Sequence, residues 1–321
     1  MKSVSAFFRL TRWRNLLIVF LTQWFIWCCV VVPMKAWNNV PLFLDAPHFL
    51  LLSLSTILIA AAGYIINDYF DVRIDIINRP GKVIIGRLIS RRWAIAMHTL
   101  LNIIGLLIAV YLGWQLHNFR VISIQLACTI LLWFYSTTFK RQFVTGNIAV
   151  ALLTALTVLI LAVFEPALYP YINFTYFIEE QGRVLVNPFG VIAVYTYFAF
   201  MLTWMREIVK DMEDFKGDAE DGCVTMPIRI GLQRSSWWVI FLGVLAVVPL
   251  AVAAFRLFAG AWMALGIYIV LALVLPLVLL MIRLPRKATQ QHYALMSRWL
   301  KIIMLAGIAS LLLYYFLQYH C

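Results

Sequence analysis

The chain has 321 residues, of which 64% are hydrophobic and 12% are charged, and its mean hydropathy is +0.90. Soluble domains carry about 25% charged residues, so this composition excludes an ordinary soluble domain and indicates an integral membrane protein. We interpret the formal net charge of +12 as membrane topology and attraction to anionic lipids, and not as nucleic-acid binding. No linker or low-complexity tract interrupts the sequence, which predicts one transmembrane domain over residues 1–321.

Nine apolar segments have the length of a membrane-spanning helix, which needs about 20 mostly apolar residues. They lie near residues 13–33, 47–66, 92–113, 118–136, 144–164, 188–206, 236–256, 258–282 and 299–318. These segments are much longer than the alternating strands of about ten residues that form membrane β-barrels. The sequence therefore predicts an all-α bundle of nine transmembrane helices.

Basic residues fall mostly on one side of this predicted topology. With nine spans, the N-terminal tail and the loops on its side of the membrane contain 22 of the 26 Lys and Arg residues. Cytoplasmic loops carry an excess of Lys and Arg. We therefore expect a multi-pass protein of the cell membrane with its N-terminus in the cytoplasm and its C-terminus outside.

Two acidic clusters with the same spacing, D-x2-D-x3-D, follow apolar spans on the predicted cytoplasmic side. Their members are Asp68, Asp71 and Asp75 in the first cluster and Asp211, Asp214 and Asp218 in the second. On an α-helix, positions i, i+3 and i+7 share one face. Each cluster is therefore predicted to present three carboxylates along one stripe of a helix.

Such stripes favour a bound cation, because like charges three or four residues apart destabilise a helix. Ligand sets made only of oxygen favour Mg²⁺, with Mn²⁺ as the alternative ion. Mg²⁺ takes few carboxylates and completes its shell with waters and substrate phosphates, so six carboxylates suit two or more Mg²⁺ ions that grip a diphosphate. Glu207 extends the second stripe by one turn, whereas Glu213, Glu220 and Asp221 fall off it and are expected to be solvated.

Basic and polar residues gather at the same predicted face. Lys140 and Lys210 are the strongest candidates for contacts with a diphosphate, because each lies beside a polar motif where a span ends. The further candidates are Arg79, Lys82, Arg87, Tyr135, Ser136, Arg141 and Arg206. For any single cation the excess of positive charge on the cytoplasmic side is an equal explanation, and Tyr135 and Ser136 have the alternative roles of interface anchor and helix cap.

These motifs resemble the signatures of the UbiA superfamily of intramembrane prenyltransferases. The first cluster, preceded by Asn67, is similar to N-D-x-x-D-x-x-x-D, and the second, preceded by Lys210, is similar to K-D-x-x-D-x-x-G-D. The Y-S-x-x-x-K-R pattern is matched by Tyr135, Ser136, Lys140 and Arg141, and a G-N pair by Gly146 and Asn147. The resemblance covers essentially the whole chain and implies nine helices around a central lipid-accessible cavity.

The resemblance implies Mg²⁺-dependent transfer of a polyprenyl group from its diphosphate to an acceptor through an allylic carbocation. The metal is expected on Asn67, Asp68, Asp71, Asp75, Asp211, Asp214 and Asp218. The catalytic residues are expected to be Asp71, Asp75, Asp211, Asp214 and Lys210, and the substrate-binding residues Tyr135, Ser136, Lys140, Arg141, Arg79, Arg87 and Asn147. The expected partners are a prenyl diphosphate, a membrane-associated acceptor and the lipid bilayer, with no nucleic acid and no obligatory protein partner.

Within the superfamily, the stretch from Asn67 to Pro80 is most similar to the archaeal-lipid branch, whose enzymes join a geranylgeranyl group to the hydroxyl of geranylgeranylglyceryl phosphate. Val83, Ile84 and Ile85 depart from the usual Pro-Ile-Pro-Ser sequence of the family. Cations beyond those assigned to the diphosphate favour an acceptor that carries a phosphate. An aromatic acceptor of menaquinone or ubiquinone synthesis is the alternative. A transporter is the alternative of another class, because charged residues at membrane spans and repeated motifs also occur there.

Overall fold

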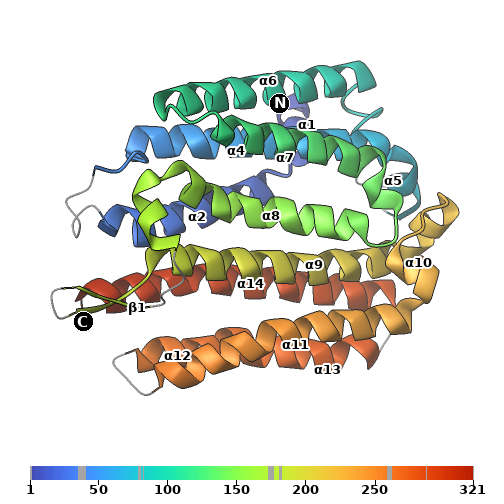
Figure 1. Ribbon diagram of the computed structural model, residues 1–321. Coiled ribbons are helices and arrows are strands. Elements are labelled where there is room, and N and C mark those ends of the chain that lie inside the picture. The colour runs from blue at the N-terminus through green and yellow to red at the C-terminus, as the bar shows by residue number, and fades with distance from the viewer. Residues whose placement is uncertain are drawn as a thin grey trace. The chain divides into compact units, whose positions relative to one another are not determined.

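The computed structural model describes residues 2–34, 41–78, 81, 83–172, 177–180, 183–258, 262–286 and 288–320. Apart from one short antiparallel hairpin, its regular structure is helical (Figure 1). The first half of the chain contains α1 (Lys2–Leu10), α2 (Trp13–Ile26), η1 (Trp27–Val31), α4 (Ala46–Phe70), α5 (Val72–Asn78), α6 (Arg91–Gln115), α7 (Arg120–Thr137), η3 (Phe139–Arg141) and α8 (Thr145–Phe164). The rest contains η4 (Pro166–Ile172), β1 (Phe177–Glu180), β2 (Arg183–Val186), α9 (Pro188–Glu220), α10 (Met226–Ile230), α11 (Leu232–Leu257), α12 (Met263–Ile269), η5 (Val270–Val274), α13 (Leu275–Arg283), η6 (Leu284–Arg286) and α14 (Gln290–His320).

Eight segments of the described chain are helical, long and apolar enough to cross a membrane. They coincide with eight of the nine predicted spans and confirm an all-α membrane bundle. The fourth predicted span corresponds to α7, whose stretch Ile122–Thr137 is a shorter apolar helix within the described residues. The turn before it uses His117 in the left-handed conformation (φ 51°), and α7 begins only at Arg120. The described residues therefore contain eight helices long enough to span a membrane, against the nine predicted, and α7 occupies the position of the remaining predicted span.

The contacts of the chain divide it into two compact units. The first unit comprises Met1–Gln23, Phe43–Ala149 and Asp214–Thr225, and the second comprises Trp24–Leu42, Val150–Glu213 and Met226–Cys321.

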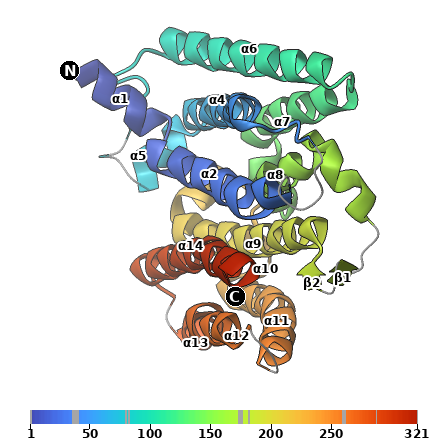
Figure 2. The same cartoon turned by 90° about the vertical axis from the view of Figure 1, so that its left-hand side faces the viewer.

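In the first unit, α6 and α7 pack against α4 (Figure 2). The hydroxyl of Ser55 on α4 donates to the carbonyl of Gly105 on α6 at 2.7 Å. A Cβ atom at Gly105 would lie 2.9 Å from Ile59, so the close approach of the two helices requires glycine at this position.

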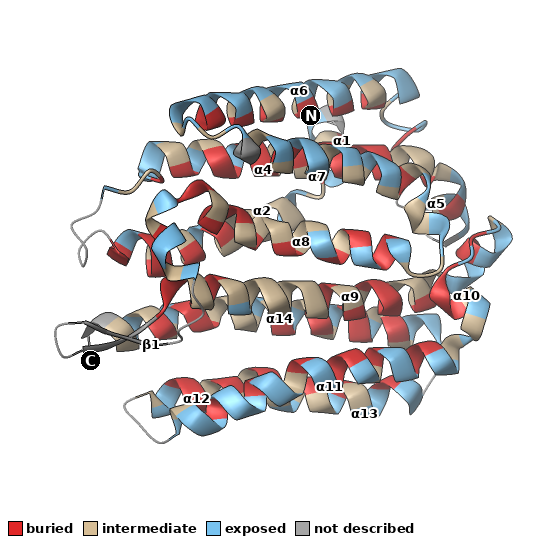
Figure 3. Ribbon diagram, in the orientation of Figure 1, coloured by how far each residue is buried: buried red, intermediate tan, exposed pale blue. Residues whose placement is uncertain are grey.

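On α6, exposed and buried residues alternate along the helix (Figure 3), and several of the exposed ones are large and apolar. Ala94 and Ala109 are fully buried, whereas Leu107 and Trp114 are 62% and 65% exposed. A helix of a soluble protein turns its large apolar residues toward the core. The reverse pattern on α6 is that of a helix whose outer face is solvated by lipid tails.

The helix α9, with 33 residues, is the longest among the described residues, and its part up to Glu213 belongs to the second unit. Polar contacts join it to its neighbours: the hydroxyls of Tyr195 and Ser310 on α14 are 2.5 Å apart, and the Tyr197 hydroxyl donates to the carbonyl of Leu245 on α11 at 2.9 Å. These bonds satisfy tyrosine hydroxyls inside the apolar bundle, where an unpaired polar group would be costly.

A small hydrophobic cluster holds α1 and the loop after α5 onto the end of α4. Its buried members are Ala6, Leu10, Ile65, Ile84, Ile85 and Ala94. The sequence departure at Val83–Ile85 thus places apolar side chains in a packing cluster. This cluster also fixes the end of α1, directly before Arg12.

Candidate functional site

The first acidic cluster lies at the end of α4. The helix ends at Phe70, and Asp71 is its C-cap with φ −85° and ψ 0°. Asp68 is therefore in the last turn of α4, whereas Asp75 is in the separate helix α5. The prediction of one continuous helical stripe is wrong for this cluster. The helix breaks at Asp71, whose side chain is bound by Asn67 and Lys140.

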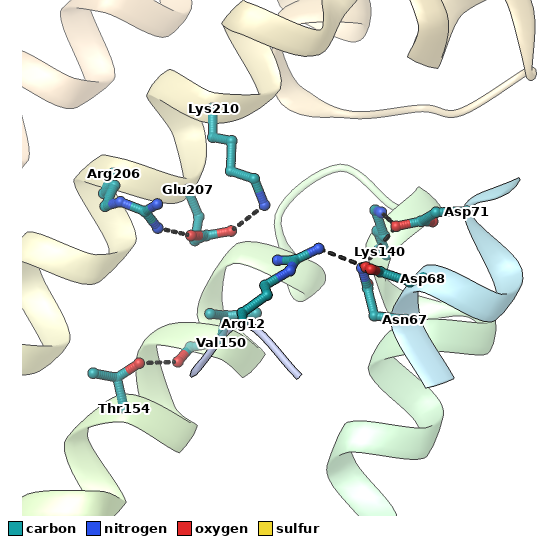
Figure 4. A network of polar contacts seen from close by, with 10 residues as sticks. All are labelled: Arg12, Asn67, Asp68, Asp71, Lys140, Val150, Thr154, Arg206, Glu207 and Lys210. Carbon is teal, nitrogen blue, oxygen red and sulfur yellow. Dashed lines mark hydrogen bonds and ion pairs between the residues drawn. The ribbon is translucent and has the colours of Figure 1, made fainter. Parts of the chain in front are cut away.

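Asp71 is buried and makes two polar contacts (Figure 4). The side-chain amide of Asn67 donates to Asp71 Oδ2 at 2.7 Å, and the ammonium of Lys140 forms a buried ion pair with the same oxygen. Burial alone would lower the pKa of Lys140, but Asp71, Tyr135 and also Asp218 raise it above its ordinary value. Lys140 is thus held as a cation beside the first acidic cluster.

Asp75 has an unusual electrostatic environment. Burial raises the pKa of its carboxyl, and repulsion by Asp71 and Asp68 raises it further, while Lys140 and Arg12 act in the opposite direction. A raised carboxyl pKa means that the ionised form is under-compensated. A cation bound here would relieve that imbalance.

Arg12 is a site residue that the sequence reasoning missed. Its Nη2 atom donates to Asp68 Oδ1 at 2.6 Å, and its guanidinium carbon lies 5.0 Å from the centre of the Tyr64 ring. It occupies the break between α1 and α2 with φ 51°, a conformation that is uncommon for residues other than glycine. In the sequence, the excess of positive charge on the cytoplasmic side already explained the basic residues of the N-terminal tail, Arg12 among them, and nothing indicated its contact with Asp68.

The second acidic cluster lies on the continuous helix α9, as predicted, so its three aspartates share one helical face. The two units divide this cluster: Asp214 and Asp218 belong to the first unit and Asp211 to the second. Asp218 is 5% exposed. Asp218 also raises the pKa of Lys140, and backbone hydrogen bonds join Cys223 to Asp218 and Val224 to Arg141, the neighbour of Lys140.

One turn before Asp211, Glu207 is buried between two cations of the second unit (Figure 4). Its Oε1 atom lies 2.7 Å from Arg206 Nη1, and its Oε2 atom lies 3.6 Å from Lys210 Nζ. Lys210, predicted to contact a diphosphate, is thus oriented by a carboxylate on its own helix.

Arg141 forms an ion pair with Asp221, with 3.0 Å between Nη2 and Oδ2. The Asp221 side chain is only 12% exposed, so the prediction that this residue is solvated is wrong. The prediction failed because the chain turns immediately after α9: the φ of Gly222 is 72°. This turn brings Asp221 to an arginine 80 positions earlier in the chain.

The turn that carries Lys140 is tightly built. A Cβ atom at Gly146 would lie 2.7 Å from the carbonyl oxygen of Phe139 and 3.0 Å from the Cα of Lys140, so only glycine permits this approach. The hydroxyl of Thr145 donates to the side-chain carbonyl of Gln142 at 2.7 Å. Gly146, noted in the sequence as half of a G-N pair, therefore supports the backbone of Lys140.

The other predicted substrate-binding residues are placed as follows. Ser136 is buried and donates to the carbonyl of Leu132 at 2.9 Å, which satisfies its hydroxyl within α7. Asn147 is buried in the first turn of α8. Arg87 is exposed in the turn after Ile84. Arg79 lies outside the described residues, as does Lys82.

The donors at the first cluster fit a hard divalent cation in chemistry, because all are oxygens. The side-chain carbonyl oxygen of Asn67 is buried without a hydrogen-bond partner among the described residues, and such an atom is costly unless a cation or water uses it. Within the described part of the chain, no three Asp, Glu, His or Cys side chains converge on one point. Arg12 and Lys140 instead compensate the carboxylates of the first cluster.

Comparison with known proteins places this site in a family. Residues 24–305 match the UbiA prenyltransferase family. The chain is 31% identical over 271 residues to the digeranylgeranylglyceryl phosphate synthase of Saccharolobus solfataricus, which covers 84% of this chain and 86% of that protein. It is 30% identical over 245 residues to the enzyme of the same name from Thermococcus gammatolerans, covering 76% of each chain. The chain therefore belongs to the UbiA prenyltransferase family.

Solved structures show the same fold. A structure of digeranylgeranylglyceryl phosphate synthase in membranes has a TM-score of 0.65, with 21% identity over 98% of this chain and 99% of that chain. A UbiA homologue from Archaeoglobus fulgidus bound to DMAPP and Mg²⁺ has a TM-score of 0.57, with 16% identity over 95% of this chain and 98% of that chain. The predicted membership in the UbiA superfamily is thus confirmed, and the protein is a multi-pass membrane prenyltransferase.

Proposed function

We propose that the protein transfers a geranylgeranyl group from its diphosphate to the free hydroxyl of geranylgeranylglyceryl phosphate, with Mg²⁺ as cofactor. The observation that carries this proposal is the similarity to digeranylgeranylglyceryl phosphate synthases over most of both chains. The cationic lysine beside two acidic segments supports it, because a diphosphate leaving group needs cations on its oxygens.

The residues of this chain then divide between metal, leaving group and acceptor. The metal ligands are drawn from the two aspartate clusters and the side-chain oxygen of Asn67. Bound Mg²⁺ would neutralise the diphosphate and make it a better leaving group. The ammonium groups of Lys140 and Lys210 stabilise the negative charge that develops on the departing oxygens. The carbocation at C1 of the donor requires that water be kept away from it, and the acceptor hydroxyl attacks it and releases its proton to the departing diphosphate or to solvent.

For the acceptor phosphate, cations beyond the two lysines are available in the first unit. Arg12 lies beside Asp68, and the exposed Arg87 follows the hydrophobic cluster. An arginine presents a planar pair of donors that matches a phosphate, whereas the carboxylate of an aromatic acceptor needs only one such partner. This surplus of cations favours a phosphorylated acceptor, with Arg79 as a further proposed contact.

We place both acidic clusters on the cytoplasmic face, with the C-terminus outside. The support is the distribution of 22 of the 26 Lys and Arg residues on one side of the predicted topology. Cysteines introduced near Gly81 and Gly217 should be labelled from the cytoplasmic side only. Labelling from outside in intact cells would reverse this orientation.

The function is tested with the purified full-length protein in detergent, using radiolabelled geranylgeranyl diphosphate and an acceptor panel. The panel contains geranylgeranylglyceryl phosphate, 4-hydroxybenzoate and dihydroxynaphthoate, each with Mg²⁺ and with EDTA. We expect a prenylated glyceryl phosphate product and diphosphate release, both dependent on Mg²⁺. If only an aromatic acceptor is prenylated, the protein belongs to quinone synthesis instead.

A further inference from the structure

Two adjacent cations in the short helix η3 contact two different acidic segments of the first unit. Lys140 pairs with Asp71 at the end of α4, whereas Arg141 pairs with Asp221 after the end of α9. Because the two cations are neighbours in the sequence, a shift of one displaces the other. The position of Lys140 therefore depends on what Arg141 holds.

The segment after α9 is joined to η3 by its backbone as well. The amide of Val224 donates to the carbonyl of Arg141 at 2.8 Å, and the amide of Cys223 donates to the carbonyl of Asp218 at 2.9 Å. Residues 221–224 thus connect Arg141 to the last aspartate of the second cluster. On the other side of η3, the backbone of Gly146 lies so close that a Cβ atom there would meet the Cα of Lys140 at 3.0 Å.

We propose that the Arg141–Asp221 ion pair is a positioning clamp, which fixes Lys140 relative to Asp71 and Asp218 during prenyl transfer. Asp221 is then a positioning residue for the reaction, although it contacts neither substrate nor metal. The expected effect of the clamp on kcat rests on the proposed function. Its effect on the local structure around Arg141 can be measured without turnover. Arg141 accordingly acts on the leaving group through Lys140, and not by binding a substrate phosphate itself.

Kinetics separate the clamp from a substrate-binding role for Arg141. If Arg141 bound the acceptor phosphate, Arg141→Gln would raise the acceptor KM, and Asp221→Asn would leave turnover intact. The clamp predicts instead that both variants lower kcat by about 100-fold with little change in either KM, because a small misplacement of a catalytic group costs about that much.

Charge reversal supplies the rescue experiment. Arg141→Asp combined with Asp221→Arg restores the ion pair with opposite polarity. The kcat of this double variant should be at least about tenfold higher than that of either single variant. The matched controls are Glu220→Gln, which removes the exposed acid next to Asp221, and Arg73→Gln, which removes an exposed cation of the same unit. Both controls should keep the wild-type kcat. Failure of rescue, or a selective rise of the acceptor KM in Arg141→Gln, would overturn the clamp.

A second measurement uses no turnover. Cys223 is 4% exposed, and burial, with Asp218 adding to it, raises the pKa of its thiol to about 11. Arg141 acts on that thiol in the opposite direction. Its loss in Arg141→Gln would therefore slow alkylation of Cys223 if the segment stayed in place.

Opening of the clamp has the opposite effect, because it exposes the thiol. We expect N-ethylmaleimide to modify Cys223 about fivefold faster in Arg141→Gln. Loss of a partly exposed ion pair should increase the population of the locally opened state by about this factor. Peptide mapping by mass spectrometry distinguishes Cys223 from the other cysteines. Unchanged or slower modification refutes the clamp. If the wild type transfers no prenyl group but Cys223 behaves as expected, the proposed function fails and the clamp stands.

Discussion

Replacing Lys140 with methionine tests how the first acidic cluster is held together. Lys140→Met keeps the volume and the flexible stem of the side chain but removes the cation from the buried Asp71 carboxylate. Asn67 still donates one hydrogen bond to Asp71, so the carboxylate keeps a dipole but loses its compensating charge. We expect both the stability and the activity of the protein to fall.

The structure sets the expected sizes of the two effects. Removing one partner of a buried ion pair costs about 3–5 kcal/mol. Because the Lys140 side chain is 23% exposed and that of Asp71 is 8% exposed, we expect a loss at the lower end of that range, about 3 kcal/mol. Loss of one group that stabilises the developing charge of the leaving diphosphate should reduce kcat about 10²–10³-fold.

The stability assay is reversible unfolding of the metal-free protein in mixed micelles with increasing SDS, followed by circular dichroism. Combining Lys140→Met with Asp71→Asn removes both charges and should recover most of the lost free energy of unfolding. Added Mg²⁺ should stabilise Lys140→Met more than the wild type, since a cation then replaces the lysine. The control is Lys216→Met, an exposed lysine of the same unit. If the double variant is no more stable than Lys140→Met, the charge-pair reasoning is wrong.

Three further outcomes are expected. Asp214→Ala should abolish Mg²⁺-dependent diphosphate release with little loss of metal-free stability, which a turnover assay with SDS unfolding checks. Asp75→Asn should stabilise the metal-free protein at neutral pH. The pKa of Asp75 is raised in the folded protein above the value of 3.8. Its protonated carboxyl therefore contributes to folding stability below pH 3.8, and this contribution is lost as the pH rises through the pKa of the folded protein. Unfolding at pH 4 and pH 7 should therefore show the benefit of Asp75→Asn only at pH 7. Alkylation of Cys223 should accelerate tenfold per pH unit up to pH 11, and a plateau below pH 9 would contradict this.

Hydropathy predicted where the spans lie, but not where their helices end. The second span was predicted to end near residue 66, whereas α4 continues to Phe70; the sixth was predicted to end near 206, whereas α9 continues to Glu220. Helical hydrogen bonding does not require apolar side chains, so a helix continues into its polar end after the hydrophobic signal stops. The extension of α4 carries Asp68 of the first cluster, and the extension of α9 carries the whole second cluster, so spacing, rather than hydropathy, identified these acids.

The residues that sequence reasoning missed are those defined by long-range contacts. Arg12 and Asp68 are far apart in the sequence, as are Arg141 and Asp221, and a single sequence gives no signal for either pair. Arg12 already had a sufficient explanation as one of many cytoplasmic cations. Asp221 does not lie on the helical stripe of the second cluster. Its burial depends on the turn after α9, which helical periodicity does not predict.

Two carboxylates of the first acidic cluster are each held through one oxygen atom. In the first cluster, Arg12 bonds to Oδ1 of Asp68, and both Asn67 and Lys140 bond to Oδ2 of Asp71. A carboxylate accepts hydrogen bonds at both oxygens, so a bond to one oxygen fixes the orientation of the other. We therefore expect Oδ2 of Asp68 and Oδ1 of Asp71 to be the metal-binding atoms. The cations would then perform two roles, because they stabilise the buried charges before a metal binds and leave the other oxygen of each carboxylate for it.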